Sequence, residues 1–186
     1  MTKVLVAYAT DHGTTRQVAR AVSDGAGRFE GCRAMARDVE DLRIDDLRDV
    51  DALILGAPVR MGSCHWAMKQ FIDRILGSLW ATSALEGRVG ALFATGAGRG
   101  GVGGGAELNM LSMLAVLAEM GMILVPLPHH TAGDHHGGLH WGPFFPTAVH
   151  SGRPVLLESD LTAARRHGFQ VAKVTRQLSP IHLTLH

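Results

Sequence analysis

The stretch K-V-L-V-A-Y-A-T-D-H-G-T-T-R-Q-V-A-R-A-V (residues 3–22) decides the fold. Its apolar opening predicts a buried strand over residues 3–9, and the spacing of the later valines and alanines predicts a helix over residues 14–28. The turn between them contains hydroxyls and a glycine but neither lysine nor arginine. In an open α/β sheet, such a turn lies at the carboxyl end of its strand, where ligands bind.

The rest of the chain repeats this alternation of strand-like and helix-length segments, which predicts a parallel sheet with helices on both faces. Five strands with crossover helices fit a doubly wound α/β fold of strand order 2-1-3-4-5. Residues 38–50 indicate a solvated connection with one helical turn. Residues 128–154 are rich in glycine, proline and histidine, so we expect a long loop without regular structure there. The predicted strands are residues 3–9, 32–38, 52–56, 89–95 and 122–126, and the predicted helices are residues 14–28, 64–77, 106–120 and 159–178, the last with Ser159 as its N-cap.

Length and composition limit the classes of function. The 186 residues, 46% of them hydrophobic, suit a single domain over residues 1–186. A formal charge of +1 argues against nucleic-acid or membrane-surface partners, which would need a basic patch. No apolar run approaches the roughly 20 residues that span a bilayer, and no secretory leader precedes the first strand. Cys32 and Cys64 are expected to be free thiols, so a cytoplasmic protein is predicted.

The opening turn has the chemistry of an anion site. The helix behind it exposes unpaired backbone N–H groups and the positive end of its dipole. Thr10, Thr14 and Thr15 add hydroxyl donors, and Gly13 lets the backbone approach a ligand closely. By spacing alone, an ordinary N-cap cluster with a turn glycine is equally compatible. The turn matches neither the G-x-G-x-x-G fingerprint nor a P-loop.

The pattern Tyr8-x-Thr10-x-x-Gly13-x-Thr15-x-x-x-Ala19-x-x-Val22 resembles the flavodoxin signature that binds the phosphate of FMN. The resemblance implies a flavodoxin-like, doubly wound, five-stranded parallel sheet that holds FMN noncovalently. It further implies that Asp11, a misfit beside a dianion, points away from the phosphate and caps the turn. The implied phosphate donors are Thr10, His12, Gly13, Thr14 and Thr15.

The segment G-A-P-V-R-M-G-S-C-H-W (residues 56–66) resembles a loop of the WrbA-type NAD(P)H:quinone oxidoreductases. Beside a flavin, the charge of Arg60 would stabilise the reduced anionic form and raise the reduction potential. A surface salt bridge is the alternative for that side chain. By the resemblance, the residues that line the isoalloxazine are Pro58, Val59, Arg60, Met61, Gly62 and Ser63.

A glycine-rich segment, T-G-A-G-R-G-G-V-G-G-G-A-E (residues 95–107), follows the fourth predicted strand. So many glycines are costly to order, so the segment is either a flexible linker or a place where backbone touches a flat ligand. It resembles a shorter WrbA-type loop that contacts the pyrimidine edge of the flavin. That resemblance assigns flavin contacts to Thr95, Gly96 and Ala97.

Histidines and tryptophans supply candidates for the substrate pocket. Residues 128–141 hold five histidines, which we interpret as weak, opportunistic ligands because no metal-binding helix spacing is present. No metal site is therefore predicted. The alternatives are that imidazoles of this run gather to bind Zn²⁺, Ni²⁺ or Cu²⁺, or that one of His129, His130 and His140 reaches the flavin pocket as a donor to the substrate. Trp80 fits the core as well as a pocket wall. The predicted pocket residues are His65, Trp66, Trp80 and His130.

The resemblance to WrbA-type proteins extends over most of the chain and implies two-electron reduction of quinones with NADH or NADPH. In that scheme the flavin does the chemistry, so no catalytic residue is assigned. The implied partners are a small-molecule quinone and further copies of the chain, as a dimer or tetramer. The alternatives are a one-electron flavodoxin carrier, an enzyme like the flavodoxin-domain protoporphyrinogen oxidases, which the first half of the chain resembles, and a flavin-free scaffold.

Overall fold

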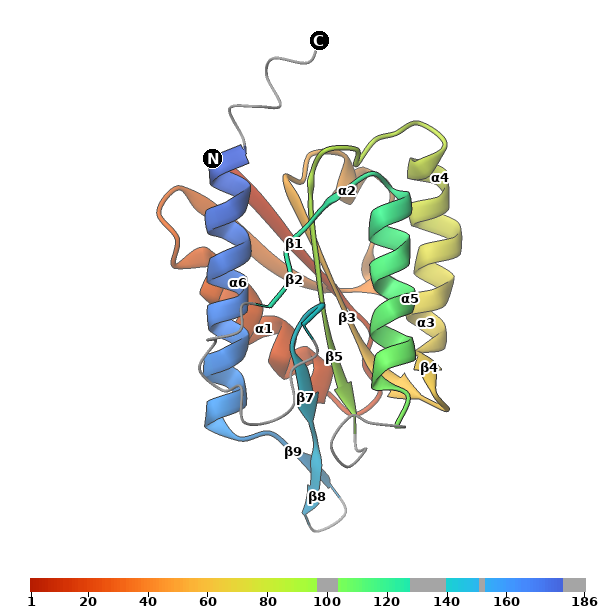
Figure 1. Cartoon of the computed structure of the whole chain (residues 1–186), viewed down its shortest axis with the longest axis vertical. Coiled ribbons are helices and arrows are strands. Elements are labelled where there is room, and N and C mark those ends of the chain that lie inside the picture. The colour runs from red at the N-terminus through yellow and green to blue at the C-terminus, as the bar shows by residue number, and fades with distance from the viewer. Residues whose placement is uncertain (97–103, 128–139, 151–152, 179–186) are drawn as a thin grey trace.

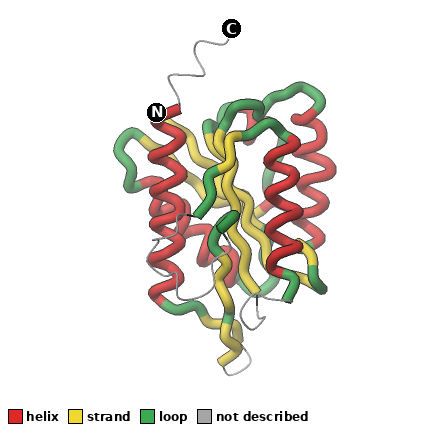
Figure 2. Tube along the Cα trace, in the orientation of Figure 1, coloured by secondary structure: helices red, strands yellow, loops and turns green. Residues whose placement is uncertain are grey.

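The computed structural model describes residues 1–96, 104–127, 140–150 and 153–178. Within these residues, a central sheet is covered by helices on both faces (Figures 1 and 2). Its main path has the order β2-β1-β3-β5-β6, all parallel, which confirms the predicted doubly wound order. These five strands are β1 (Thr2–Tyr8), β2 (Cys32–Asp38), β3 (Ala52–Arg60), β5 (Val89–Gly96) and β6 (Ile123–Leu124).

Two short strands extend this sheet near the ends where ligands are expected. β4 (Ser63–Cys64) pairs antiparallel with the end of β3. β7 (Phe144–Pro146) pairs parallel with the end of β5, whereas β6 pairs with the beginning of β5. The fifth position of the sheet is therefore shared by two segments that lie far apart in sequence.

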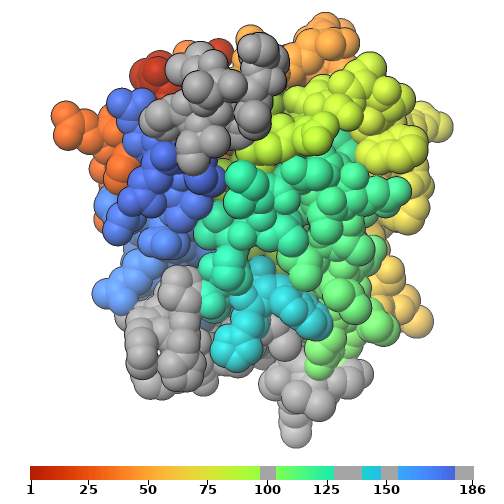
Figure 3. Space-filling model, turned by 45° about the horizontal axis from the view of Figure 1, so that its top comes forward, coloured from red at the N-terminus to blue at the C-terminus, as the bar shows by residue number. Residues whose placement is uncertain are grey.

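The helices divide between the two faces of the sheet. α1 (Thr14–Gly27) and α6 (Glu158–Leu178) cover one face. The other face is covered by α5 (Ala106–Glu119) and by a continuous run of helix, α3 (Trp66–Phe71), the π-helical turn η2 (Ile72–Leu76) and α4 (Gly77–Trp80). In the space-filling view α5 lies at the surface of the molecule (Figure 3). The connection after β2 contains η1 (Val39–Asp41) and α2 (Asp45–Arg48), and β8 (Ala148–His150) and β9 (Arg153–Val155) form a two-stranded ribbon.

Alternation along β1 divides the core into two layers. Val4 and Val6 pack toward α1 and α6, whereas Leu5 and Ala7 pack with the residues of α3 and α5. A strand buried on both faces reads as a continuous apolar run, which is why the sequence identified it. No described helix meets the length and hydropathy that a bilayer crossing would require.

Close contact between α1 and α6 depends on two glycines. A Cβ on Gly25 would overlap the backbone of Arg165, and a Cβ on Gly168 would overlap the carbonyl of Val22. Cores of this density do not yield easily to an added carbon. The glycines therefore set how closely α6 approaches α1.

Several predicted boundaries were wrong. Residues 128–154 are not a loop throughout, because the described part contains β7, β8 and part of β9. The strand predicted over residues 122–126 has only two residues in β6. Ser159 is not the N-cap of α6, which begins at Glu158. Instead, the Asp160 carboxylate accepts a 2.8 Å hydrogen bond from the Leu157 N–H.

Candidate functional site

Residues 10–15, here called the anion cup, lie between the carboxyl end of β1 and the beginning of α1. Gly13 is the N-cap of α1 with φ 84°, and no side chain caps the helix. The first helical hydrogen bond runs from Gln17 N–H to the Gly13 carbonyl, so the preceding amides of the first turn have no partner within the helix. A Cβ built on Gly13 would meet open space, and the first turn contains no acidic residue. The cup is therefore open and suited to an anion.

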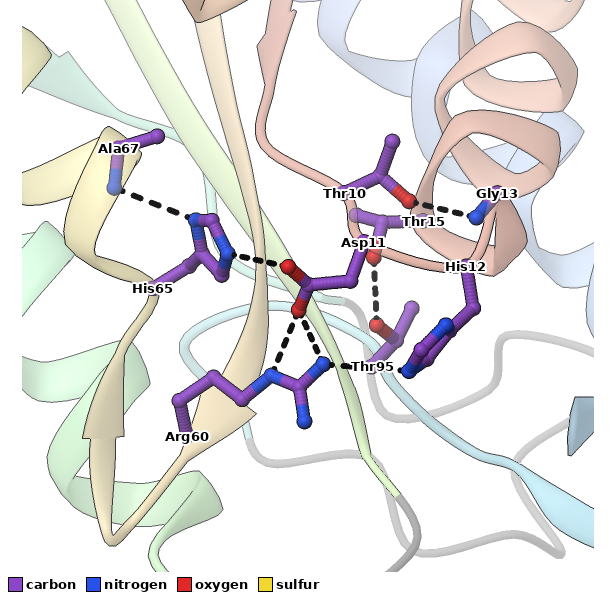
Figure 4. Close-up of polar contacts among 9 residues, drawn as sticks. All are labelled: Thr10, Asp11, His12, Gly13, Thr15, Arg60, His65, Ala67 and Thr95. Carbon is purple, nitrogen blue, oxygen red and sulfur yellow. Dashed lines mark hydrogen bonds and ion pairs between the residues drawn. The ribbon is translucent and has the colours of Figure 1, made fainter.

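The threonines of the cup have different partners. Thr10 Oγ1 accepts a 3.0 Å hydrogen bond from Gly13 N–H, and this bond holds the turn. The hydroxyls of Thr15 and Thr95 are 2.9 Å apart and both are buried, so they join α1 to β5 (Figure 4). Only one of these two hydroxyl hydrogens is used in the bond, so the other remains to be donated. Thr14 is also buried, in the first turn of the helix.

Asp11 does not cap the turn as predicted, because Thr10 does so. The Asp11 side chain does point away from the other residues of the cup, as predicted, and its carboxylate lies against Arg60 and His65 (Figure 4). Its Oδ2 accepts hydrogen bonds from Nε of Arg60 at 2.7 Å and from Nη2, and its Oδ1 is 2.9 Å from Nε2 of His65. Burial raises the pKa of Asp11, but the hydrogen bonds of His65 and Arg60 and the charge of Arg60 outweigh it and hold that pKa below its ordinary value.

His65 links the cup to the beginning of α3. It is buried, it is the N-cap of α3, and its Nδ1 accepts a 3.2 Å hydrogen bond from Ala67 N–H. With Nδ1 an acceptor, the neutral ring must carry its hydrogen on Nε2, which then donates to Asp11. On the other side, Arg60 Nη2 is 3.4 Å from Nε2 of His12.

The predicted flavin shelf is the end of β3 and a tight hairpin turn. Arg60 pairs with Ser63 across the turn, and the two residues between them, Met61 (φ 47°) and Gly62 (φ 76°), both have positive φ, as in a type I′ turn. Met61 is fully exposed at the tip. A Cβ on Gly105, at the beginning of α5, would overlap the backbone of Gly62. The glycine-rich segment therefore ends against the shelf.

Contacts between strand ends bring the remaining predicted residues to the same edge of the sheet. In β3 and β5, Pro58 is the register partner of Thr95. A Cβ on Gly96 would be 3.3 Å from Val59 and from Phe144 of β7. The predicted cofactor residues within the described chain thus lie at one rim, whereas Ala97 lies outside the described residues.

A cavity of about 530 Å³ lies beside the anion cup. The exposed indole of Trp66 and the Lys69 ammonium, which pairs with Asp73 at 2.6 Å, lie on α3 at this cavity. Trp80 ends α4, about 20 Å along the helical run from Trp66, and does not line it. The lining residues are Asp11, Arg60, Ser63, Cys64, His65, Trp66, Lys69 and Ser112.

The structure adds residues to the predicted set and leaves others outside it. Lys69 could have been inferred from its position one helical turn after His65, but nothing in the sequence places Ser112 of α5 at the cavity. Cys64 is buried and free, and burial raises its pKa, so its thiol is poorly reactive; Cys32 is also free, as predicted. His130 lies outside the described residues, and the described part of the chain contains no group of three or more potential metal ligands.

Known proteins resemble this chain over most of its length. The flavodoxin-domain family model matches residues 5–99. A protein named flavodoxin from Aquifex aeolicus is 33% identical, over 93% of this chain and 86% of that protein. A protein named NAD(P)H dehydrogenase (quinone) from Archaeoglobus fulgidus is 34% identical, over 96% of this chain and all of that protein (100%). One of the same name from Geotalea uraniireducens is 31% identical, over 95% and 99%.

Solved structures agree in fold. A WrbA-like flavodoxin from Agrobacterium tumefaciens superposes with a TM-score of 0.72 at 23% identity, covering 95% of this chain and 99% of that one. An archaeal flavodoxin gives 0.69 at 19% identity, covering 94% and 99%. These likenesses confirm the predicted fold and, with the sequence relatives, the family resemblance drawn from the motifs.

Proposed function

We propose, from the premise that this chain belongs to the flavodoxin family, that it binds FMN noncovalently and reduces quinones by two electrons with NADH or NADPH. The observation that carries this proposal is the cavity beside the anion cup. Both a carrier and an enzyme need room for the flavin at the shelf, but this cavity extends past the shelf to Trp66, Lys69 and Ser112, where a nicotinamide and then an acceptor would be admitted. Relatives named NAD(P)H dehydrogenase (quinone) support the same function.

The residues of the cup fit the phosphate of FMN. The cup offers helix-terminal amides and hydroxyls, and open space lies in front of Gly13. The carboxylate of Asp11, which would repel a dianion, is turned to Arg60 and His65. The phosphate would be held by Thr10, His12, Gly13, Thr14 and Thr15, and the isoalloxazine by the shelf, Pro58 to Ser63, together with Thr95, Gly96 and Ala97.

Bound FMN supplies hydride acceptance and donation at its ring. The chain's own residues bind and orient the reactants. The β3–β4 turn, whose course is set by the positive φ of Met61 and Gly62, would offer its backbone amides to the edge of the planar ring. Trp66 gives the cavity a flat apolar wall suited to a quinone or a nicotinamide ring, and the ion-paired side chains of Arg60 and Lys69 give it a polar border. No described side chain needs to act as nucleophile or base.

The assembly that we propose is a homodimer or homotetramer in the cytoplasm. α5 is apolar around most of its circumference, yet Leu108 and Leu111 are exposed. A helix of that composition is ordinarily buried on all sides, so this face suits contact with a second copy. Sedimentation of the wild-type protein and of Leu108→Glu tests this point: the variant is expected to be monomeric, and a monomeric wild type would contradict it.

A one-electron carrier is the second candidate, favoured by the relative named flavodoxin. The near-neutral formal charge of +1 argues against it, since carriers of this kind steer toward basic partners with a strongly acidic surface.

The deciding experiment follows the visible spectrum of the purified protein with FMN. Anaerobic NADPH or NADH is expected to bleach the flavin with one equivalent, and benzoquinone is expected to restore the colour and to sustain turnover. A stable blue semiquinone without turnover would favour the carrier. Failure to bind FMN would reject both candidates and leave a flavin-free scaffold.

A further inference from the structure

Three ionisable side chains that are far apart in sequence form one connected group at the edge of the anion cup. Asp11 comes from the cup, Arg60 from the end of β3, and His65 from the N-cap of α3 (Figure 4). Each carboxylate oxygen of Asp11 has its own partner: Oδ2 receives the guanidinium of Arg60, and Oδ1 is bonded to His65. The carboxylate thus ties together the cup, the shelf and the helix that lines the cavity.

The direction of these bonds is fixed. His65 Nδ1 is an acceptor for Ala67 N–H, so the neutral ring donates to Asp11 through Nε2. Two Arg60 nitrogens converge on the other oxygen, and one of them, Nη2, also lies 3.4 Å from His12. The position of the guanidinium is therefore set by Asp11, because the arginine is otherwise partly exposed and free to rotate.

This geometry changes the charge that the site presents. The sequence left two interpretations of Arg60, a cation that raises the reduction potential of the flavin or a surface salt bridge, and the structure shows the salt bridge. In the structure its charge is paired with a carboxylate at 2.7 Å, so the pair as a whole is neutral. A carboxylate in the turn that holds a phosphate is unfavourable by itself, and the guanidinium also compensates for it.

We propose that Asp11 is a positioning residue that fixes Arg60 beside the anion cup and cancels its charge, so that the site stabilises reduced, anionic FMN less than an unpaired arginine would. The inference rests on the proposed binding of FMN. It assigns to Asp11 a role opposite in sign to that of Arg60, although the two side chains touch. A purely structural role for Asp11 would give no such opposition.

The test is a double-mutant cycle of Asp11→Asn and Arg60→Gln, read as the two-electron midpoint potential of bound FMN measured against a reference dye. The pair is neutral in the wild type, positive in Asp11→Asn, negative in Arg60→Gln and neutral again in the double variant. We expect the potential to be highest in Asp11→Asn, lowest in Arg60→Gln, and similar in the wild type and the double variant. A tenfold change in the ratio of the affinities for reduced and oxidised FMN corresponds to about 30 mV, and each single variant is expected to shift by about this amount.

Asp46→Asn is the matched control. Asp46 pairs with Arg37 at 2.8 Å between β2 and α2, and the side-chain exposures of that pair, 32% and 36%, are close to the 31% of Asp11 and 46% of Arg60. Asp46→Asn removes an aspartate–arginine pair of similar exposure that lies away from the cavity. The midpoint potential of bound FMN is therefore expected to stay at the wild-type value. A shift equal to that of Asp11→Asn would overturn the proposal, because a general change of charge would then explain both.

Other outcomes separate this inference from the proposed function. If the wild-type protein binds no FMN, both fail. If it binds FMN but Asp11→Asn lowers the potential, or the double variant resembles Arg60→Gln, only the inference fails. Should Asp11→Asn not fold, judged by far-ultraviolet circular dichroism, the double variant decides, because it contains no unpaired guanidinium: a potential equal to that of the wild type supports the inference, and one equal to that of Arg60→Gln overturns it. A readout without flavin is the ¹⁵N spectrum of His65, expected to show the Nε2–H tautomer in the wild type and altered Nε2 shifts in Asp11→Asn.

Discussion

His167 gives the protein a pH-dependent stability that can be calculated from the structure. It lies on α6 and is 1% exposed, and neither ring nitrogen makes a hydrogen bond of normal geometry among the described residues, although the backbone of Leu92 is near enough to interact with the ring. Burial lowers its pKa from 6.5 to about 4, and the backbone of Leu92 opposes part of that shift. The folded protein therefore keeps this imidazole neutral at pH values where the unfolded chain protonates it.

The sign follows from proton binding. Between pH 6.5 and about 4 the unfolded chain binds one more proton at this position, so the free energy of unfolding falls as the pH falls. The free energy of unfolding changes by about 1.4 kcal/mol per pH unit for one proton, so it falls by about 3 kcal/mol across the whole window. Above pH 7 the contribution vanishes, because His167 is neutral in both states.

The perturbation is His167→Leu, which keeps an apolar side chain of similar size and removes the titration. Urea unfolding of both proteins, followed by circular dichroism at the same FMN concentration, gives their difference in unfolding free energy at each pH. That difference is expected to be constant above pH 7 and to move in favour of the variant by about 3 kcal/mol as the pH falls to 4. A difference that does not change between pH 7 and 4.5 would refute the reasoning, as would an NMR titration of His167 near 6.5.

Three substitutions test other parts of the structure. Gly13→Ala is expected to weaken FMN binding, measured by fluorescence quenching, because its Cβ enters the open cup. Gly31→Ala, also at positive φ with open space around it, is the control for backbone strain of about 1–2 kcal/mol. An equal loss of FMN affinity in both variants would contradict the assignment of the cup as the phosphate site. His65→Leu is expected to lose about 1 kcal/mol of unfolding free energy with the N-cap of α3, whereas His65→Asn keeps the cap and should stay near the wild type; equal losses would show that the cap is unimportant. Gly168→Ala is expected to lower the unfolding free energy, measured by thermal denaturation, by about 1–3 kcal/mol through overlap with α1. Gly27→Ala, with nothing near its Cβ, should be neutral or slightly stabilising in the same measurement. A tolerated Gly168→Ala would mean that α6 can move away from α1.

The sequence could predict the sheet and the anion cup because both depend on local pattern. β1 is a continuous apolar run, and the turn after it combines hydroxyls with Gly13 directly before a helix. β7, β8 and β9 were missed because they are three-residue strands in a segment rich in glycine and proline. Strands that short carry no period, and β7 depends on pairing with the distant β5.

Contacts between distant residues could not be predicted. Asp11 and Arg60 are 49 positions apart, so neither the ion pair nor its effect on the charge at the cup was visible before the strands were placed side by side. Trp80 was predicted at the pocket, but the helix from Trp66 continues through a π-helical turn and carries Trp80 away from the cavity. The position of Trp80 depends on how far the helical run extends, and the composition of this segment did not predict that length.

The fifth position of the sheet is divided between β6 and β7, so the beginning and the end of β5 are each paired with a different short strand. β6 is held by the first residues of β5 and β7 by the last, so each has its own register. Because β7 reaches the rim that carries the cup and β6 does not, a substitution in β7 would alter that rim without disturbing the pairing of β6 with β5.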